Sequence, residues 1–186
     1  MQPRDEIQAD LKQTLSAKRY CHTMSVMYTA ASLAMRYNEN VESAMLAALL
    51  HDCARQLSFE EMLDLCKQHD LHISVHEQKT PALLHAKAGA TLATVKYGVE
   101  DERILDAIRC HTTGKPAMNT LEKIVFLADY IEPERQRVGL DEIRTLVFTN
   151  LDMGLLSVLK NSLSYLEQTQ TDIDTMTMQT YQYYKH

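Results

Sequence analysis

Apolar residues recur along most of the chain at steps of three and four residues, which is the period of an amphipathic α-helix. In the segment 20–37 they mark one predicted helical face made of Tyr20, Met24, Met27, Ala31, Ala34 and Met35. The run 44–50, Ala-Met-Leu-Ala-Ala-Leu-Leu, is apolar on all sides. It predicts a helix that is buried in the centre of the fold.

Capping and stop signals set the ends of further helices. Ser58 followed by Glu61 predicts a capping box that opens a helix running to about residue 68. Pro81 starts a helix that continues to about residue 97, and Asp101 begins another that Gly114 and the proline after it stop. The remaining predicted helices are 3–15, 120–131, 140–149 and 151–166, with a loop at 69–80 and a poorly defined tail from 167.

The composition agrees with a helical protein. Only five Gly and four Pro occur in 186 residues, and helix-favouring Ala, Leu, Met, Glu, Lys and Gln fill long stretches. We therefore predict an all-α fold. A chain of this length can bury one sizeable core, so residues 1–186 are predicted to form a single domain.

Charge and the N-terminal residues argue against several classes of protein. The 19 basic and 25 acidic residues give a net charge of -6, and no basic stripe follows a predicted helix, so a nucleic-acid partner is not expected. Residues 1–6 lack the order of a signal peptide, and no segment reaches about 18 uninterrupted apolar residues. We expect a soluble, cytoplasmic protein with no membrane partner.

The cysteines do not suggest a metal or redox site. Cys21, Cys53, Cys66 and Cys110 are widely spread and form no Cys-x-x-Cys pair. Three of them adjoin a histidine or an aspartate, but neighbours on a helix point about 100° apart. They are expected to be reduced, buried thiols that pack as small hydrophobic groups.

Two aspartates interrupt strongly apolar helices. The dipeptide His-Asp occurs at 51–52 and again at 69–70, but only His51-Asp52 ends the most apolar helix, whereas His69-Asp70 lies in a polar stretch. Asp129 lies inside Ile-Val-Phe-Leu-Ala-Asp-Tyr-Ile. Because burying an unpaired carboxylate is costly, each of these aspartates is predicted to face a base or a metal ion.

Three histidines share this apolar setting. His85 lies on a predicted helical face with Ala88, His111 lies on one with Ile108, and His22 is near the start of the 20–37 helix. A single buried histidine or aspartate is usually a hydrogen-bonded core residue, a cap or part of an ion pair. Six such residues on five helices form a more specific pattern.

In this order the six residues resemble the metal-binding signature of the HD-domain superfamily of phosphohydrolases, in its two-metal form. The sequence motifs around these residues are similar to those of the YqeK subfamily. The matching segments are Arg19-Tyr-Cys-His22-Thr, Leu50-His51-Asp52-Cys-Ala-Arg55, Leu84-His85-Ala, His111-Thr-Thr-Gly114 and Ala128-Asp129-Tyr-Ile-Glu-Pro133-Glu-Arg135. The resemblance extends from about residue 15 to about residue 165.

The resemblance implies a helical HD-domain bundle with a dinuclear metal site in its core. The ligand-bearing part would be about 15–135, followed by C-terminal helices at about 140–186. His22, His51, Asp52 and Asp129 would hold one ion and Asp52, His85 and His111 the other, with Asp52 bridging. Four imidazoles and two carboxylates favour Fe, Mn, Co or Ni over Mg or Ca, and the family implies Fe.

The implied reaction is symmetrical hydrolysis of diadenosine tetraphosphate or a related dinucleoside tetraphosphate to two nucleoside diphosphates, ADP or GDP. Two bridged ions can hold the attacking hydroxide and neutralise phosphoryl charge. The predicted catalytic residues are Asp52, Arg55, His85 and His111. The predicted substrate contacts are Arg19, Arg55, Lys87, Thr112, Thr113, Gly114 and Arg135, with Lys115 as a further candidate cation.

One segment departs from the family pattern. Glu134-Arg135-Gln136-Arg137-Val138-Gly139 replaces the small residue and the aromatic-Pro-Gly segment that commonly surround the arginine, although Arg135 itself is retained. Two other functions stay open at this point: an HD-type nucleotidase that acts on nucleoside monophosphates, and a nucleotide-binding regulator with little catalysis. Exposed apolar residues in the C-terminal third could support a homodimer.

Overall fold

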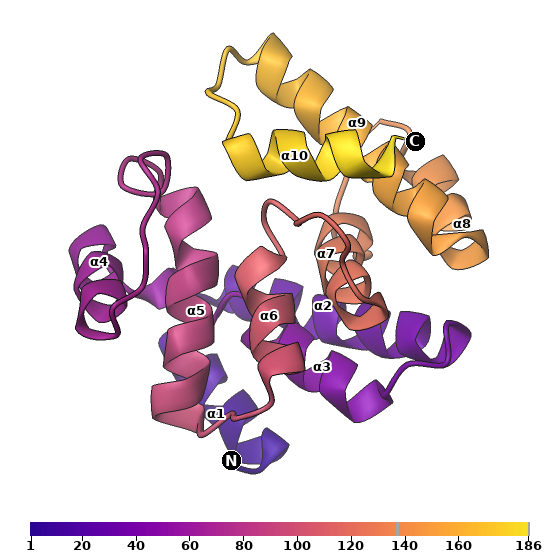
Figure 1. Cartoon of the computed structure of the whole chain (residues 1–186). Helices are drawn as coiled ribbons and strands as arrows, with labels where there is room; N and C mark the ends of the chain where they lie inside the picture. Colours follow the sequence, from indigo (N-terminus) through magenta and orange to yellow (C-terminus); the bar gives the residue numbers. More distant parts are fainter. Residues whose placement is uncertain (137, 186) are drawn as a thin grey trace.

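The computed structural model describes residues 1–136 and 138–185, and this part of the chain contains ten α-helices, one short 3-10 helix and no strand (Figure 1). The predicted all-α fold is confirmed. The helices are α1 (Arg4–Thr14), α2 (Ala17–Arg36), α3 (Val41–Leu50), the 3-10 helix η1 (Cys53–Gln56), α4 (Phe59–Gln68), α5 (Pro81–Tyr97), α6 (Glu102–Cys110), α7 (Thr120–Ile131), α8 (Leu140–Thr149), α9 (Leu151–Gln168) and α10 (Thr175–Tyr184).

The predicted start signals act as expected. The Ser58 hydroxyl accepts a hydrogen bond from the Glu61 backbone N–H, and the Glu61 carboxylate accepts one from the Ser58 N–H, which completes the capping box of α4. Pro81 occupies the first turn of α5. Residues 69–80 contain turns but neither helix nor strand, as the sequence predicts.

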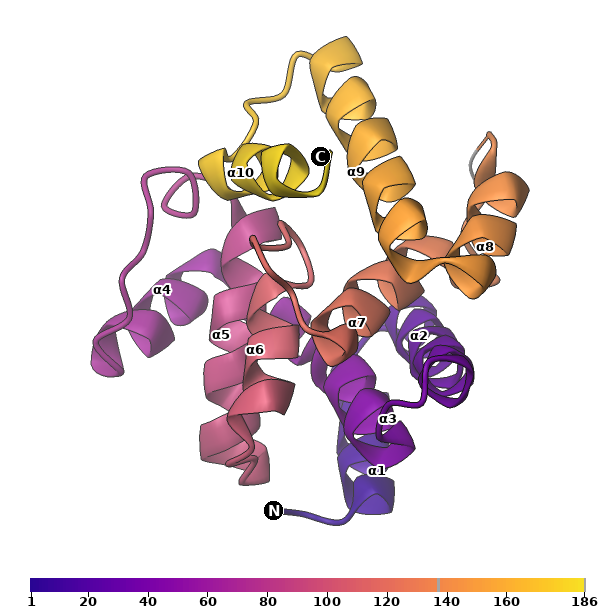
Figure 2. The ribbon, with the colours of Figure 1, turned by 45° about the vertical axis from the view of Figure 1, so that its right-hand side comes forward.

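Helix α3 lies at the centre of the bundle. Six of its ten residues are buried, and it packs against α2, α6 and α7. Figure 2 shows α2, α3 and α7 grouped together, with α5 and α6 side by side next to them. Because apolar burial stabilises by about 25 cal/mol per Å² of surface removed from water, the apolar run 44–50 of this helix stabilises the packing of the elements around it.

The buried face of α2 differs from the predicted one, because it includes Val26, Ala30 and Leu33. Met27 and Ala34 are buried, whereas Met35 is 67% exposed and Cys21 is exposed. At about 100° per residue, Met35 lies about 80° and Cys21 about 120° from Met27 around the helix. Both side chains therefore fall outside the packed stripe, and the prediction of a buried Cys21 is wrong. The other three cysteines are buried and free.

The C-terminal tail forms a packed helix. Helices α8, α9 and α10 lie at the end of the bundle where α7 and the segment 112–118 are found (Figures 1 and 2). The Tyr184 hydroxyl of α10 accepts a hydrogen bond from the Met118 N–H at 2.7 Å. Exposed apolar side chains, including Phe148 and Met153, occur in the C-terminal third of the chain. The homodimer inferred from such residues stays a prediction. None of the described helices is long and apolar enough to cross a membrane.

Gly154 permits the close approach of α8 and α9, and its replacement tests this packing. A Cβ at Gly154 would lie 2.6 Å from Val147 Cγ2 and 2.8 Å from Val147 Cα. Gly154→Ala is expected to lower the free energy of unfolding by about 1–3 kcal/mol through overpacking, although alanine is the better helix former. Thermal unfolding measures the effect. The exposed Asn161→Ala on the same helix is the control, with a change within about 0.5 kcal/mol, and equal stabilities for both variants would contradict the packing argument.

Candidate metal centre

Five helices bring the six predicted ligand residues together. His22 belongs to α2, His51 caps the C-terminal end of α3 and is followed by Asp52, and His111 caps the C-terminal end of α6. His85 lies within α5 and Asp129 near the C-terminal end of α7. The cluster thus forms where buried helix interiors and helix ends meet in the core.

The Asp52 carboxylate lies between two sets of imidazoles. Its Oδ2 is 3.4 Å from His51 Nε2 and 3.7 Å from His22 Nε2. Its Oδ1 is 3.0 Å from His85 Nε2 and 4.0 Å from His111 Nε2. The two oxygens of one side chain therefore face different histidine pairs, which is the arrangement that a bridging ligand requires.

Asp129 lies beside His22 and His51, the histidines that face Asp52 Oδ2. Its Oδ1 lies 3.0 Å from His22 Nε2 and 3.9 Å from His51 Nε2. Two groups of three have all their ligand atoms within 4.8 Å of one another: His22, His51 and Asp129 form one, and His51, Asp52 and His111 form the other.

The histidine rings are oriented with Nε2 toward the cluster. Nδ1 of His51 lies 2.6 Å from the Ala48 carbonyl oxygen, and Nδ1 of His111 lies 2.7 Å from that of Ile108. A ring that donates from Nδ1 keeps the Nε2 lone pair free for a metal. Within the described part of the chain, Nε2 of His22 and Nε2 of His51 are buried and have no hydrogen-bond partner in suitable geometry, although carboxylate oxygens lie 3.0 Å and 3.4 Å from them. Since buried polar atoms are rarely left unpaired, these two atoms fit a metal ion.

Burial sets the charges of the cluster. Burial, reinforced by the neighbouring histidines, lowers the pKa of His111 to about 3, and burial also lowers the pKa of His85. Burial opposes ionisation of Asp52, but His51 and His85 outweigh it and hold the pKa of Asp52 well below its usual range. Burial likewise disfavours a charged His51, although Asp52 and Asp129 raise its pKa overall. The ionised carboxylate of Asp52 and the neutral imidazoles of His85 and His111 are thus in the forms that bind metals.

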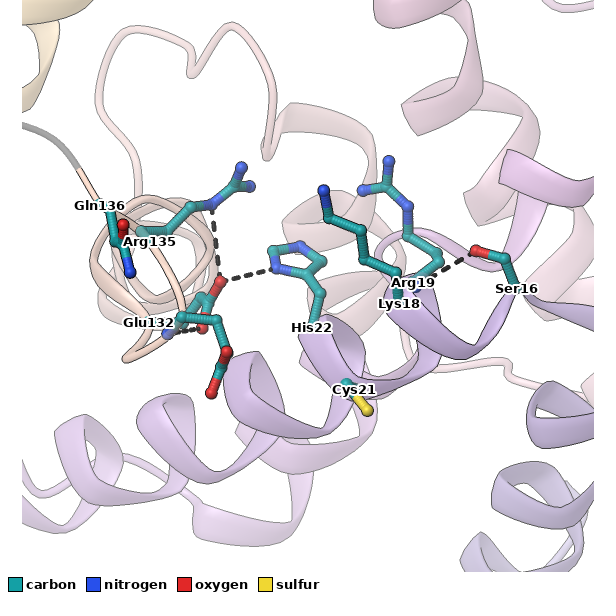
Figure 3. A pocket seen from close by; sticks show the side chains of 9 residues that line it. Ser16, Lys18, Arg19, Cys21, His22, Glu132, Arg135 and Gln136 are labelled. Carbon is teal, nitrogen blue, oxygen red and sulfur yellow. Dashed lines mark hydrogen bonds and ion pairs between the residues drawn. The ribbon is translucent and has the colours of Figure 1, made fainter.

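A cavity of about 690 Å³ opens beside His22 (Figure 3). Figure 3 shows His22 between Glu132 and Arg135 on one side and Lys18 and Arg19 on the other. The residues that line this cavity are Ser16, Lys18, Arg19, Cys21, His22, Glu132, Glu134, Arg135 and Gln136. The approach to the cluster is therefore polar and carries several cationic side chains.

Three predicted arginines reach the cluster. Arg19 Nη1 lies 2.7 Å from Asp52 Oδ2, and Arg55 Nε lies 3.2 Å from Asp52 Oδ1. Arg135 Nη2 lies 2.7 Å from Asp129 Oδ1. Each of the three side chains keeps about a third of its surface exposed, with values of 36%, 31% and 31%.

The other predicted substrate contacts line a second cavity, of about 450 Å³. It is formed by residues that include Lys87, Thr112, Thr113, Gly114 and Lys115, together with the start of α10. Lys87 follows His85 by two positions, so it points about 200° away from it around α5, and it pairs with Glu77 at 2.7 Å. Lys115 pairs with the buried Glu122 at 2.8 Å. This cavity is not the one that Arg19 and Arg135 line, and the role of this set in substrate binding stays a prediction.

An arginine of α8 binds the backbone on both sides of Pro133, where the atypical segment 134–139 begins. Arg144 donates hydrogen bonds to the backbone carbonyl oxygens of Ile131, Glu132 and Arg135. Gly139, at a φ of +74°, precedes α8 in the left-handed conformation that favours glycine. Arg137, which belongs to the same segment, lies outside the described residues.

Glu132 also lies at the cluster, although no role was predicted for it from the sequence. Its side chain is 2% exposed, and Oε1 lies 3.0 Å from His22 Nδ1. The available signal was its position three residues after Asp129, because residues at this spacing share one face of a helix.

Comparison with known proteins identifies the family to which this chain belongs. A family model described as HD domain matches residues 19–134, which include all six cluster residues. The Bacillus subtilis protein named "Bis(5'-nucleosyl)-tetraphosphatase, symmetrical" is 41% identical over 96% of this chain and 95% of its own length. The protein of the same name from Halalkalibacterium halodurans is 42% identical over 92% of this chain and 91% of its own length.

A crystal structure from Clostridium acetobutylicum, described as a predicted HD superfamily hydrolase involved in NAD metabolism, has a TM-score of 0.96 and 37% identity. The match covers 100% of this chain and 98% of that chain. An HD domain implies a divalent metal ion, and the histidines and aspartates of the cluster fit one. The chain belongs to the HD domain family and, within it, to the family of proteins named symmetrical bis(5'-nucleosyl)-tetraphosphatase.

Proposed function

We propose that this protein hydrolyses diadenosine tetraphosphate and related dinucleoside tetraphosphates symmetrically, to two nucleoside diphosphates. The observation that carries the proposal is the Asp52 carboxylate, whose two oxygens face separate pairs of histidines beside a cationic cavity. The relatives named for this activity extend over nearly the whole chain. A small nucleotide is the substrate class that fits this family.

The proposed centre holds two ions. His22, His51, Asp52 and Asp129 would hold the first, and Asp52, His85 and His111 the second. Iron is the proposed metal, because a set dominated by imidazoles suits Fe, Mn, Co or Ni rather than Mg or Ca. When bound, such a pair supplies Lewis acidity to a phosphoryl oxygen and lowers the pKa of water.

The arginines supply the polyphosphate contacts. Arg19, Arg55 and Arg135 lie 2.7–3.2 Å from the carboxylates of the cluster, so their guanidinium groups border the place where the phosphates would react. A planar guanidinium can bind two phosphate oxygens at once and stays charged at any physiological pH. These residues would orient the bridging phosphates and neutralise the departing diphosphate.

We also propose a cytoplasmic location. The nucleotide substrate class supports it, and so do the buried, unpaired thiols of Cys53, Cys66 and Cys110, since free cysteines are typical of reducing compartments. Burial raises the pKa of the Cys53 and Cys110 thiols, that of Cys110 to about 12, so both stay protonated. They pack beside the cluster rather than act in it.

The products of diadenosine tetraphosphate test the proposed reaction directly. Incubation of the metal-loaded protein with this substrate, followed by chromatography, is expected to yield ADP alone, at two molecules per substrate. ATP together with AMP would contradict symmetrical cleavage. Phosphate release from dAMP or dGMP without action on the dinucleotide would support a monophosphate nucleotidase instead.

Replacement of Asp52 tests the bridging role. Asp52→Asn is expected to abolish measurable turnover and to remove most of the bound metal, because the amide cannot offer two anionic oxygens to the two sets of histidines. Elemental analysis per chain measures the loss. Asp70→Asn is the matched control, since it changes the exposed aspartate of the second His-Asp dipeptide and is expected to leave metal and activity intact. Two ions per chain in the Asp52→Asn variant would rule out a bridging carboxylate.

A further inference from the structure

Glu132 is a buried carboxylate that the proposed mechanism does not use. It follows the last residue of α7 as its C-cap and is 1% exposed, although Pro133 and an exposed Glu134 come directly after it. A buried carboxylate is costly unless its oxygens are hydrogen-bonded or paired. Its contacts therefore define what it does.

Both oxygens of Glu132 are engaged. Oε1 lies 3.0 Å from His22 Nδ1 and 3.7 Å from Arg135 Nε. Oε2 accepts a hydrogen bond from the Glu134 backbone N–H at 2.6 Å. Figure 3 shows this carboxylate pointing at His22, with dashed lines that join it to both His22 and Arg135.

His22 needs such a partner because of its place in the fold. His51 and His111 are C-cap residues, and the carbonyl groups of Ala48 and Ile108 in the last helical turn accept their Nδ1 protons, that of Ile108 in addition to a 3.5 Å bond from the His111 backbone N–H. His22 lies inside α2, where the preceding carbonyl groups are used by the helix itself. The acceptor for its Nδ1 comes from another element, since α7 supplies Glu132, whereas Nδ1 of His85 inside α5 has no partner in the described part of the chain.

We propose that Glu132 is a positioning residue for the metal centre. It accepts the Nδ1 proton of His22, fixes the ring with Nε2 toward Asp129, and thereby sets the affinity for the ion held by His22, His51 and Asp129. It binds no metal itself. The inference rests on the proposed metal centre and adds to it the group that orients one of its ligands. Carboxylates that hold a metal-binding histidine in this way typically change metal affinity by about 10- to 100-fold when they are replaced.

Metal retention in two variants tests this role. The cobalt-loaded full-length chain is titrated with a competing chelator, and released and retained cobalt are measured together with the visible absorption of the bound ions. Glu132→Gln, whose amide can accept at only one of its two terminal atoms, and Glu132→Ala are both expected to lose one of two ions at about 10- to 100-fold lower chelator concentration than the wild type. The second ion is expected to stay in place.

The matched control is Glu122→Gln. Glu122 is equally buried, at 2% exposure, and lies at the opposite end of α7, where it forms a capping box with Asn119 and pairs with Lys115. This variant loses the same charge from the same helix and is expected to change thermal stability but not cobalt retention. Folded Glu132 variants that hold both ions as tightly as the wild type would overturn the role of Glu132 alone. A wild-type chain that binds no ion would instead overturn the metal centre.

The tautomer of His22 gives a test that needs no variant. In the zinc-loaded wild-type protein labelled with ¹⁵N-histidine, long-range ¹H–¹⁵N NMR is expected to show a proton on Nδ1 of His22 and none on Nε2. A proton on Nε2 would contradict the proposal, because that nitrogen could then not bind the ion.

Discussion

The structure depends on one buried carboxylate. Asp52 is 2% exposed in a core of apolar helices, and removing an ionised carboxylate from water costs several kcal/mol even after the protein relaxes. Arg19 and Arg55 offset this cost with two cationic contacts, and the Nε2 atoms of four imidazoles lie within 3.0–4.0 Å of the carboxylate. The positions of the helices that carry these groups therefore depend on contacts with Asp52 as well as on the packing of their apolar faces.

Helix ends explain how so many polar groups fit into the core. The last turn of a helix has carbonyl groups without intrahelical partners, and His51 and His111 use them as acceptors. Each of these rings thus satisfies a helix end and is oriented by it at the same time. His22 lacks this local solution, which is why the conformation of α7 beyond Asp129 matters for a ligand on α2.

Much of the fold and the cluster was predictable from the sequence because the signals were strong and local. The capping box at Ser58, the all-apolar run at 44–50 and the interruption of apolar helices by Asp52 and Asp129 each have one simple physical interpretation. The six cluster residues followed from these interruptions together with the family resemblance. That resemblance was needed, since spacing alone does not show that five helices meet at one point.

The burial of Cys21 was predicted wrongly because of its direction around the helix. It adjoins His22 in sequence but points to another side of α2. Glu132 next to Pro133 looks like an exposed helix end, and only the packing of α7 on α2 buries it against His22. The α10 helix was poorly defined because a Thr-, Gln- and Tyr-rich sequence has weak periodicity, and contacts such as Tyr184 with Met118 fix it.

The most direct test of the central claim is a crystal structure of the metal-loaded protein with anomalous diffraction data collected at the absorption edge of the bound metal. The account predicts two anomalous peaks per chain, one on each side of Asp52, the first beside His22 and Asp129 and the second beside His85 and His111. A single peak, or peaks that Asp52 does not separate, would contradict it.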